Sequence, residues 1–436
     1  MKILLYGLNF APELTGIGKY TGELAAWLAA RGHQVRVVTA PPYYPAWKLG
    51  VGFRNGWCTE AISECLVYRC PLWVPSRPGG AKRLLHLASF ALSSLPVMLR
   101  QILWRPDVVW VVEPALFCAP TALVVARLSG AKAWLHVQDF EVDAAFDLGL
   151  LKGQRMRHWV AAGERWLMRR FDVVSTISQR MHQRLICKGV APAKAVLAPN
   201  WVDIAAIAPS SSTGGESFRT QLGIATDAVV ALYSGNMGAK QGLELLADVA
   251  RLCEKDAEQN QALALTKKRH SAIVFVFCGS GAGRSDLVQR CAGLSHVHFL
   301  GLQPLERLGD LLAMADIHLL PQRADAADLV MPSKLTGMLA SGRPVVATAC
   351  VGTELAGVVG GNSGSAVCGM VTPPGDAVAF ARAVQMLAAD AALRQQLGAA
   401  GQAYAAAYLD RDVVLQKFEG EMLSLIQHRD NPLQRI

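Results

Sequence analysis

The sequence predicts an α/β fold made of two doubly wound, Rossmann-like domains that face a central cleft. The chain has 436 residues, enough for two domains that each bury a core. Short apolar runs rich in β-branched residues alternate with helical patterns, which indicates parallel sheets covered by helices on both faces. This alternation starts again after a polar segment near residue 209, so the pattern occurs twice.

The first half opens with an apolar run at 2–6. This run is too short for the core of a signal peptide and meets Pro12 and Glu13, so we interpret it as a buried strand and not as a targeting segment. We expect further strands at 34–39, 108–112, 133–137 and 173–176. Helical patterns lie between them, the clearest at 18–30 and 154–170.

The second half follows the polar run PSSSTGGES at 209–217, which is typical of a linker. After it we expect strands at 229–233, 273–278, 296–299, 317–320 and 345–347. Helices are expected at 243–256, 305–314, 333–340 and 377–387. The predicted domains therefore span 1–205 and 206–411, and a helix within 412–436 is expected to pack back on the first domain.

The cysteine spacing and the net charge indicate the cellular compartment of the protein and the kind of partner that it binds. The ten cysteines include no CxxC pair, which is typical of reduced thiols in a cytoplasmic protein. Residues 1–205 hold 24 Lys and Arg against 13 Asp and Glu, so the formal charge of +9 resides in this half. Such asymmetry indicates an anionic partner, either nucleic acid or a membrane surface.

The stretch at 84–104 favours the membrane surface over nucleic acid. It is apolar, and the basic cluster Arg77, Lys82 and Arg83 directly precedes it. It is also long enough to span a bilayer, but Pro96 and Arg100 within it argue against a true span. We therefore expect peripheral association with an anionic inner-membrane surface. The alternative is a solvated basic face beside a buried helix.

Glycines follow several predicted strands, where a doubly wound sheet binds its ligands. Gly16 and Gly18 follow the first strand, and a plain tight turn would explain them equally well. Gly235, Asn236 and Lys240 follow the first strand of the second half, which is a stronger signal for phosphate. The spacing differs from that of a P-loop, which disfavours an ATPase.

Two further junctions complete the candidate phosphate site. Gly279 and Gly281 lie in a GxGxxG-like turn, but no acidic residue follows at the distance that a NAD dehydrogenase requires. Ser333 and Lys334 follow Pro332, so a helix capped by Ser333 would direct its amides and the Lys334 ammonium at one point. An ordinary capped helix with a surface lysine is the alternative.

Candidate catalytic side chains lie at the end of the predicted strand 133–137. Asp139 could accept a proton or orient an acceptor hydroxyl, with His136 beside it and Glu141 and Asp143 as further candidates. The alternatives are a core histidine at His136 and a helix cap at Asp139. We find no clustered carboxylates near the glycine loops, so we expect no metal.

Five motifs in order resemble the GT-B fold glycosyltransferases of family 4, over nearly the whole chain. They are TGIGKYTGELAAWLAARGHQVRVVT, DVVSTISQRM with VLAPNWVD, YSGNMGAKQGLELL, FCGSG with FLGLQPLERLGDLLAMADIHLLPQ, and GMVTPPGDAVAFARAVQMLAAD. DLVMPSKLTGMLASGRPVVAT is similar to the colanic acid and exopolysaccharide branch of that family. Members of this branch are assigned as fucosyltransferases, with GDP-fucose as the sugar donor.

The resemblance implies positions for the donor. Gly16 and Gly18 would approach its phosphates from the first domain, and the loop at Asn236 and Lys240 from the second. The base would lie near 279–281 and 300–303, including Gly301. Two departures from the family pattern concern the sugar and the ribose. The family has two glutamates here, eight positions apart. Gly337 stands at the position of the second glutamate, and the position of the first aligns near Leu329, with Asp325 and Asp328 close by.

The implied function is a retaining sugar transfer, most readily of L-fucose from GDP-fucose, onto a lipid-linked glycan in exopolysaccharide biosynthesis. The leaving phosphate would help to deprotonate the acceptor, and preorganised donors with lysine would stabilise the leaving group. No cofactor is implied beyond the nucleotide-sugar substrate, and no nucleic acid. The alternatives are a GT-B-fold nucleotide-sugar 2-epimerase and a non-catalytic nucleotide-sugar binder.

Overall fold

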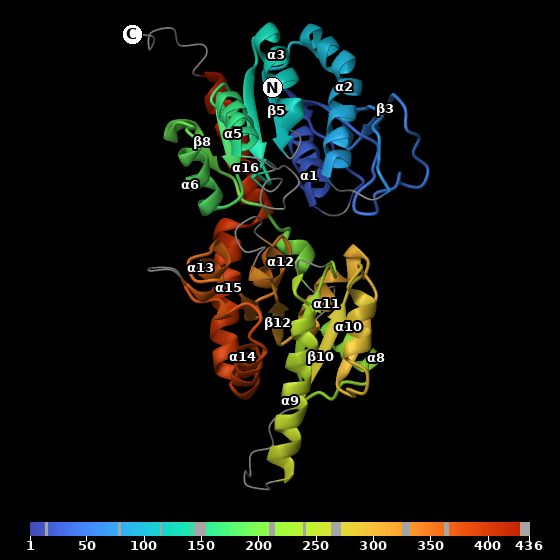
Figure 1. Cartoon of the computed structure of the whole chain (residues 1–436), viewed down its shortest axis with the longest axis vertical. Coiled ribbons are helices and arrows are strands. Elements are labelled where there is room, and N and C mark those ends of the chain that lie inside the picture. The colour runs from blue at the N-terminus through green and yellow to red at the C-terminus, as the bar shows by residue number, and fades with distance from the viewer. Residues whose placement is uncertain are drawn as a thin grey trace. The chain divides into compact units, whose positions relative to one another are not determined.

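The structure is a computed structural model that describes residues 1–13, 16–76, 80–113, 116–140, 142–143, 154–208, 214–238, 241–262, 272–324, 332–361 and 366–427. The chain divides into two compact units (Figure 1). Unit 1 comprises Met1–Pro199 and Val414–Ile436, and unit 2 comprises Asn200–Val413. The division at 199 and 200 lies six residues before the predicted boundary at 205.

Unit 1 contains an eight-stranded sheet in the order β3-β4-β2-β1-β5-β6-β7-β8. The strands are β1 (Lys2–Tyr6), β2 (Gln34–Thr39), β3 (Cys58–Ile62), β4 (Cys65–Arg69), β5 (Val108–Glu113), β6 (Lys132–Val137), β7 (Val173–Thr176) and β8 (Ala195–Leu197). Every neighbouring pair is parallel except β3 with β4. The parallel core is as expected, whereas the antiparallel edge strand was not predicted.

The helices of unit 1 cover both faces of this sheet. They are α1 (Gly16–Ala30), α2 (Gly80–Trp104), α3 (Ala119–Ser129), α5 (Gln154–Met168), α6 (Gln179–Cys187) and α16 (Arg411–Gln427), with the short η1 (Leu116–Cys118) and η2 (Pro192–Lys194). Helix α2 connects β4 to β5, α3 connects β5 to β6, and α5 connects β6 to β7. All three connections therefore cross the sheet in the same direction. Because such crossovers are right-handed, these three helices share one face.

Helix α16 packs on unit 1 although it follows unit 2 in the sequence. The Phe418 ring lies 5.8 Å from that of Trp134 and 6.5 Å from that of Trp110, centroid to centroid. The Glu419 carboxylate accepts a hydrogen bond from Arg31 at 2.8 Å and lies 2.7 Å from His33 Nε2. Apolar and charged contacts therefore both join this helix to unit 1.

Unit 2 contains a six-stranded, fully parallel sheet in the order β11-β10-β9-β12-β13-β14. Its strands are β9 (Val229–Ser234), β10 (Ile273–Cys278), β11 (Val297–Leu300), β12 (Ile317–Leu320), β13 (Val345–Thr348) and β14 (Gly369–Thr372). Its helices are α7 (Ile204–Ile207), α8 (Gly214–Gln221), α9 (Glu244–Ala262), α10 (Arg284–Arg290), η4 (Leu305–Arg307), α11 (Leu308–Met314), α12 (Lys334–Ala340), α13 (Glu354–Gly360), α14 (Ala377–Ala389) and α15 (Ala391–Tyr408). This is the doubly wound arrangement that the sequence predicted.

The predicted linker at 209–217 is wrong for its second half. Residues 214–217 form the first turn of α8, and 209–213 lie outside the described residues. A Cβ on Gly214 would lie 1.9 Å from Asp310 Oδ1, and one on Gly215 would lie 2.8 Å from the Ala313 carbonyl carbon. The glycines therefore let α8 approach α11 closely, which explains a composition that resembles a linker.

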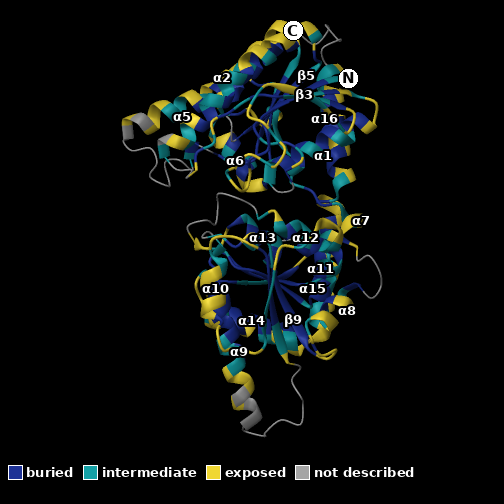
Figure 2. Cartoon of the chain, turned by 90° about the vertical axis from the view of Figure 1, so that its right-hand side faces the viewer, coloured by how far each residue is buried: buried dark blue, intermediate teal, exposed yellow. Residues whose placement is uncertain are grey.

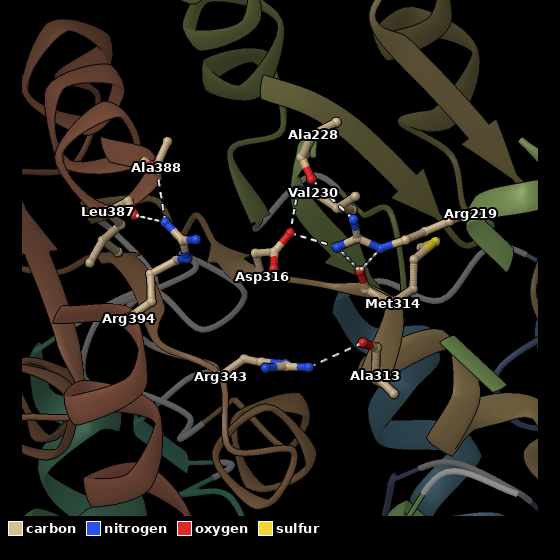
Figure 3. Close-up of polar contacts among 10 residues, drawn as sticks. All are labelled: Arg219, Ala228, Val230, Ala313, Met314, Asp316, Arg343, Leu387, Ala388 and Arg394. Carbon is tan, nitrogen blue, oxygen red and sulfur yellow. Dashed lines mark hydrogen bonds and ion pairs between the residues drawn. The ribbon is translucent and has the colours of Figure 1, made fainter. Parts of the chain in front are cut away.

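A half-buried arginine joins α8 to the sheet of unit 2 (Figure 3). The Arg219 guanidinium donates to the Met314 carbonyl at 2.9 Å and to the Asp316 carboxylate at 2.6 Å. The same carboxylate accepts the Val230 amide at 2.8 Å, at the start of β9. Asp316 thus has a structural role, because it holds both α8 and the start of β9.

Helix α2 is the one described helix whose segment Lys82–Trp104 is long and apolar enough to cross a membrane, by length and composition. One side of it faces the sheet of unit 1. Ser94 Oγ lies 2.6 Å from Tyr6 Oη, and Arg36 donates to Gln101 Oε1 at 3.0 Å. Helix α2 therefore lies along unit 1 with one face in its core.

Candidate functional site

Two glycine loops meet at the carboxyl edge of the unit 2 sheet. Gly235 follows β9 and Gly279 follows β10, and these strands are parallel neighbours. The Gly235 amide donates to the Cys278 carbonyl at 3.0 Å, and the Met237 amide donates to the Ser280 carbonyl at 2.8 Å. The loops are therefore held against each other by backbone hydrogen bonds.

Close packing between the loops requires the glycines themselves. Gly279 has φ +146°, and a Cβ there would lie 1.9 Å from the Gly235 carbonyl oxygen. Gly281 has φ +144°, and a Cβ there would lie 2.6 Å from the Met237 carbonyl oxygen. Any side chain would push the loops apart, so these glycines shape the site even before a ligand is considered.

The Lys334 ammonium lies at the first of these loops. It is 2.9 Å from Tyr233 Oη and 4.2 Å from the centroid of the Tyr233 ring. A Cβ on Gly235 would lie 3.8 Å from Lys334 Nζ. Burial lowers the pKa of Lys334 to about 7. Two residues that were predicted from separate motifs, Gly235 and Lys334, are therefore brought together.

Tyr233 connects Lys334 to the glycine loop and was missed by the sequence analysis. Its hydroxyl accepts from the Lys334 ammonium and donates to the Asn236 carbonyl at 2.6 Å. Burial raises its pKa, so it stays neutral and can donate. A tyrosine inside an apolar strand pattern indicates only β-propensity. Its position just before the glycine loop is the one feature of the sequence that could have indicated a role in the site.

The other predicted residues of unit 2 lie in different settings. Ser333 has helical φ and ψ of −59° and −25° and makes no capping hydrogen bond, so the predicted N-cap is wrong, because a cap needs an extended backbone. Its side chain is exposed. The Gly301 carbonyl accepts from Gln303 Nε2 at 3.1 Å. Lys240 and Asp328 lie outside the described residues.

Gly337, the position of the expected glutamate, lies in α12. A Cβ there would lie 3.7 Å from Leu312 Cδ1 and 3.8 Å from Ile207 Cδ1, which are ordinary contacts. A Cβ at this position would therefore fit, and it would lie in apolar surroundings.

The first glycine loop of unit 1 surrounds a buried carboxylate that the sequence analysis did not select. Glu13 accepts the amides of Tyr43 and Tyr44, both at 3.0 Å, and the Asn9 side chain at 2.9 Å. A Cβ on Gly18 would lie 2.5 Å from Glu13 Oε2. Gly18 is thus required by Glu13, and the positive φ of +63° at Gly16 forms the turn before it.

Asp139 lies near Tyr44, whose amide binds Glu13. The pKa of Tyr44 is raised by burial first and then by the charges of Asp139 and Glu13, while Arg83 opposes them. An acidic and a phenolic side chain therefore lie close together beyond β6. Asp139 itself is half-buried.

His136 is a core residue in the structure. Its Nδ1 lies 2.8 Å from Ser175 Oγ and its Nε2 lies 2.9 Å from Gln138 Nε2. The ring stacks on Trp110, and burial lowers its pKa to about 3. The imidazole is therefore neutral and held on both sides, which is the core alternative that the sequence left open.

The two further acidic candidates differ. Asp143 pairs with Lys188 at 3.0 Å and Arg184 at 2.9 Å, so it joins the segment after β6 to α6. Glu141 lies outside the described residues. Within the described ranges no group of three or more His, Cys, Asp or Glu residues could hold a metal ion.

Known proteins resemble both units. The model of a glycosyl transferase 4-like domain matches residues 15–201, and that of glycosyl transferases group 1 matches residues 228–390. A relative from Escherichia coli K12, named as putative colanic acid biosynthesis glycosyl transferase WcaI, is 41% identical over 96% of this chain and 98% of its own length.

Solved structures share the fold. Sucrose-phosphate synthase from Thermosynechococcus elongatus superposes with a TM-score of 0.73 at 17% identity, over 98% of this chain and 99% of its own. HepE from Anabaena in complex with UDP has a TM-score of 0.66 at 17% identity, over 97% and 100% of the two chains. At such identities the likeness concerns the fold, and it confirms the predicted GT-B class.

Proposed function

The chain belongs to the GT-B fold glycosyltransferases of the family 4 and group 1 type, and from this membership we propose that unit 2 holds the diphosphate of its nucleotide-sugar donor between the glycine loops and Lys334. The sugar then passes to an acceptor hydroxyl. The predicted residues Gly235, Asn236, Gly279 and Gly281 belong to this donor site in the proposal.

The observation that carries the proposal is the setting of the Lys334 ammonium. It is half-buried beside a glycine loop, and no carboxylate pairs with it among the described residues. Its hydrogen-bond partner there is the neutral Tyr233 hydroxyl. A desolvated ammonium without a counter-charge favours an incoming anion, and backbone close to it can approach phosphate oxygens.

The proposed chemistry follows from that placement. Negative charge develops on the leaving diphosphate, and the Lys334 ammonium is positioned to stabilise it. Retention of the anomeric configuration and deprotonation of the acceptor by the leaving phosphate belong to the proposal. On the acceptor side we propose Asp139, close to Tyr44, as the residue that orients the hydroxyl.

For the substrates, we propose GDP-fucose and a lipid-linked glycan of colanic acid or a related exopolysaccharide. The E. coli relative supports the pathway through its name. The Anabaena structure with UDP-glucose supports a nucleotide-sugar as the class of donor. The enzyme would act in the cytoplasm at the inner membrane, where a lipid-linked acceptor is available.

A donor screen with a matched pair of lysine variants tests the proposal. Calorimetry with GDP- and UDP-sugars should show that Lys334→Met weakens binding of the best donor by about 2–4 kcal/mol, the range for a lost charged partner. Lys255→Met, at an exposed position of α9, should leave the affinity unchanged. Equal donor affinity of the Lys334 variant and the wild type would remove Lys334 from the site.

Product analysis then distinguishes the activities. Radiolabelled GDP-fucose is incubated with the protein and a membrane lipid extract. Label in the lipid phase supports transfer. An isomerised nucleotide-sugar would indicate an epimerase, and binding without turnover would indicate a non-catalytic protein.

A further inference from the structure

The loop after β2 presents an aromatic ring beside the first glycine loop of unit 1. Tyr44 is 41% exposed, and a Cβ on Gly16 would lie 3.5 Å from Tyr44 Cε1. The Tyr44 amide donates to the Glu13 carboxylate at 3.0 Å, so the backbone that carries the ring is fixed. In Figure 2 the middle of the unit 1 sheet is buried, and exposed residues lie in the loops around it. Tyr44 is one of these exposed residues, so part of its ring surface is open to a ligand.

A second aromatic side chain of the same loop is supported by buried rings. The Trp47 ring lies 5.6 Å from that of Tyr43 and 5.2 Å from that of His86, centroid to centroid. Tyr43 and His86 are buried, whereas Trp47 is half-buried. His86 Nδ1 lies 2.6 Å from the Trp73 carbonyl oxygen, which fixes the imidazole. The two buried rings therefore hold the indole of Trp47 in place and leave part of it at the surface.

Trp47 has a backbone conformation that tryptophan rarely adopts. Its φ is +53°, in the left-handed region. The loop is closed by the Lys48 amide, which donates to the Tyr43 carbonyl at 3.3 Å, and by the Gly50 amide, which donates to the Pro42 carbonyl at 2.8 Å. Glycine at position 47 would close the same loop with less strain. Because strain of this kind is concentrated at functional sites, it indicates a use for the indole itself.

Charged side chains of both signs lie near these rings. Burial raises the pKa of Tyr44, the charge of Asp139 adds to the effect, and the Arg83 charge opposes it. Burial also lowers the pKa of His86, and the Arg83 charge lowers it further. Arg83 is therefore close both to Tyr44 and to the imidazole that supports Trp47. The two partly exposed rings, a guanidinium and a carboxylate thus lie in one part of unit 1.

We propose that Tyr44, Trp47, Arg83 and Asp139, here called the aromatic site, bind one sugar ring of the glycan acceptor. A pyranose has an apolar face of C–H groups that packs on aromatic rings, and it has hydroxyls around its rim. The Arg83 guanidinium can donate to such hydroxyls, and the Asp139 carboxylate can accept from them. Aromatic surface with a few polar groups at its edge is the common composition of a small-molecule site.

This inference deepens the proposed function and rests on it, because Asp139 is there the residue that orients the acceptor hydroxyl. It adds the ring that carries this hydroxyl and the side chains that recognise the ring. Packing on Tyr44 and Trp47 requires a closed ring with an apolar face. An open-chain polyol has the same hydroxyls without such a face, so it is the discriminating control.

Saturation-transfer difference NMR of the full chain tests the inference. The pyranose probes are methyl β-D-glucopyranoside, methyl β-D-galactopyranoside and methyl α-L-fucopyranoside, and sorbitol is the open-chain control. At least one glycoside should receive saturation from the protein, most strongly at the protons of one ring face, and sorbitol should receive much less. Equal transfer to the glycosides and to sorbitol, or no transfer to any glycoside, would overturn the inference.

Matched variants locate the bound sugar. Tyr44→Leu and Trp47→Leu should each weaken binding of the best glycoside about fivefold or more, because each removes one aromatic face. The controls are Tyr408→Leu, at an exposed position of α15, and Trp159→Leu, at an exposed position of α5. The Tyr44 variant keeps the test decisive if Trp47→Leu lowers the stability of unit 1, since Tyr44 is the more exposed side chain. Equal losses in the controls, or none in the test variants, would show that the sugar binds elsewhere.

Two further measurements separate this inference from the proposed function. Donor affinity of Tyr44→Leu should equal that of the wild type, because the proposed donor site lies in unit 2. In the assay with GDP-fucose and membrane lipid extract, this variant should need about fivefold more extract for half-maximal labelling, with little change in the maximal rate. An unchanged requirement for extract would contradict the aromatic site and leave the transferase proposal intact. Glycoside binding that depends on Tyr44, without any sugar transfer, would contradict the transferase proposal and leave the sugar site intact.

Discussion

The free energy of protonating Lys334 depends on the groups that lie beside its side-chain nitrogen. In the unliganded site, burial lowers its pKa to about 7, so near neutral pH about half of the molecules carry the charge. A bound diphosphate would add negative charge close to the nitrogen and raise that pKa. Donor binding and proton uptake are therefore linked at this one side chain.

The linkage predicts a pH dependence of donor affinity. Below pH 7 Lys334 is already charged, and affinity should be constant. Above pH 7 the free site must take up a proton to bind, so affinity should fall by up to about tenfold per pH unit. Calorimetry between pH 6 and 9, in buffers with different ionisation enthalpies, measures both quantities. Constant wild-type affinity across this range, or the same slope in Lys334→Met, would contradict the linkage.

Residue-level features of the site were predictable only in part. Gly235 and Lys334 were selected from separate motifs, because glycine and lysine at strand-to-helix junctions are typical of phosphate sites in doubly wound sheets. Glu13 and Tyr233 were missed. Their importance comes from contacts with Gly18 and Lys334, and a linear pattern does not show which side chains fill the space beside a glycine.

At the scale of elements, the two glycine loops after β9 and β10 form one packed unit. The loops are joined by backbone hydrogen bonds, and the loop after β9 approaches so closely that it leaves no room for a side chain on Gly279 or Gly281. The position of the Asn236 carbonyl, and with it the Tyr233 hydroxyl and Lys334, depends on that packing.

Gly279→Ala should therefore be far more costly than an ordinary glycine substitution. We expect unit 2 to lose about 2–5 kcal/mol, because the new Cβ meets the Gly235 carbonyl and the backbone has positive φ. Gly375→Ala is the matched control, since its φ is +81° and nothing lies within 4 Å of a Cβ there. It should cost about 1–2 kcal/mol, from the backbone alone. Urea unfolding of both variants measures the difference, and equal costs would argue against tight loop packing.

Strands and helices with strong patterns were predicted closely. The strands at 2–6, 34–39, 173–176, 273–278 and 317–320 have the predicted bounds. The missed strands β3, β4, β8 and β14 are short, and three of them lie at sheet edges. Burial of β3 does not alternate clearly, and β14 begins with glycine, so neither carries a period-two signal.

For the whole molecule, unit 1 is assembled from two distant segments of the chain. Its sheet and most of its helices come from residues before 200, and the helix that covers Trp110 and Trp134 comes from residues after 413. Unit 2 is continuous between them. The stability of unit 1 therefore depends on residues that the sequence places beyond the other unit.

A chain that ends after Val413 should show this dependence. Unit 1 should lose its cooperative unfolding transition, because the aromatic face at Trp110 and Trp134 is uncovered, while the transition of unit 2 should remain. The milder Glu419→Gln should lower the stability of unit 1 by about 1–3 kcal/mol through its bonds with Arg31 and His33. Calorimetry with hydrogen exchange assigns the transitions to the units. Loss of both transitions, or of neither, would be inconsistent with this division.

The discontinuity of unit 1 also fixes an order of events during translation. The ribosome produces the sheet of unit 1 first, but the helix that completes its core is made only after all of unit 2. The continuous unit 2 can therefore finish folding before the unit that begins the chain. In the meantime the nascent first segment exposes an aromatic surface, so chaperones that bind such surfaces should engage this protein there, and should release it once α16 has docked.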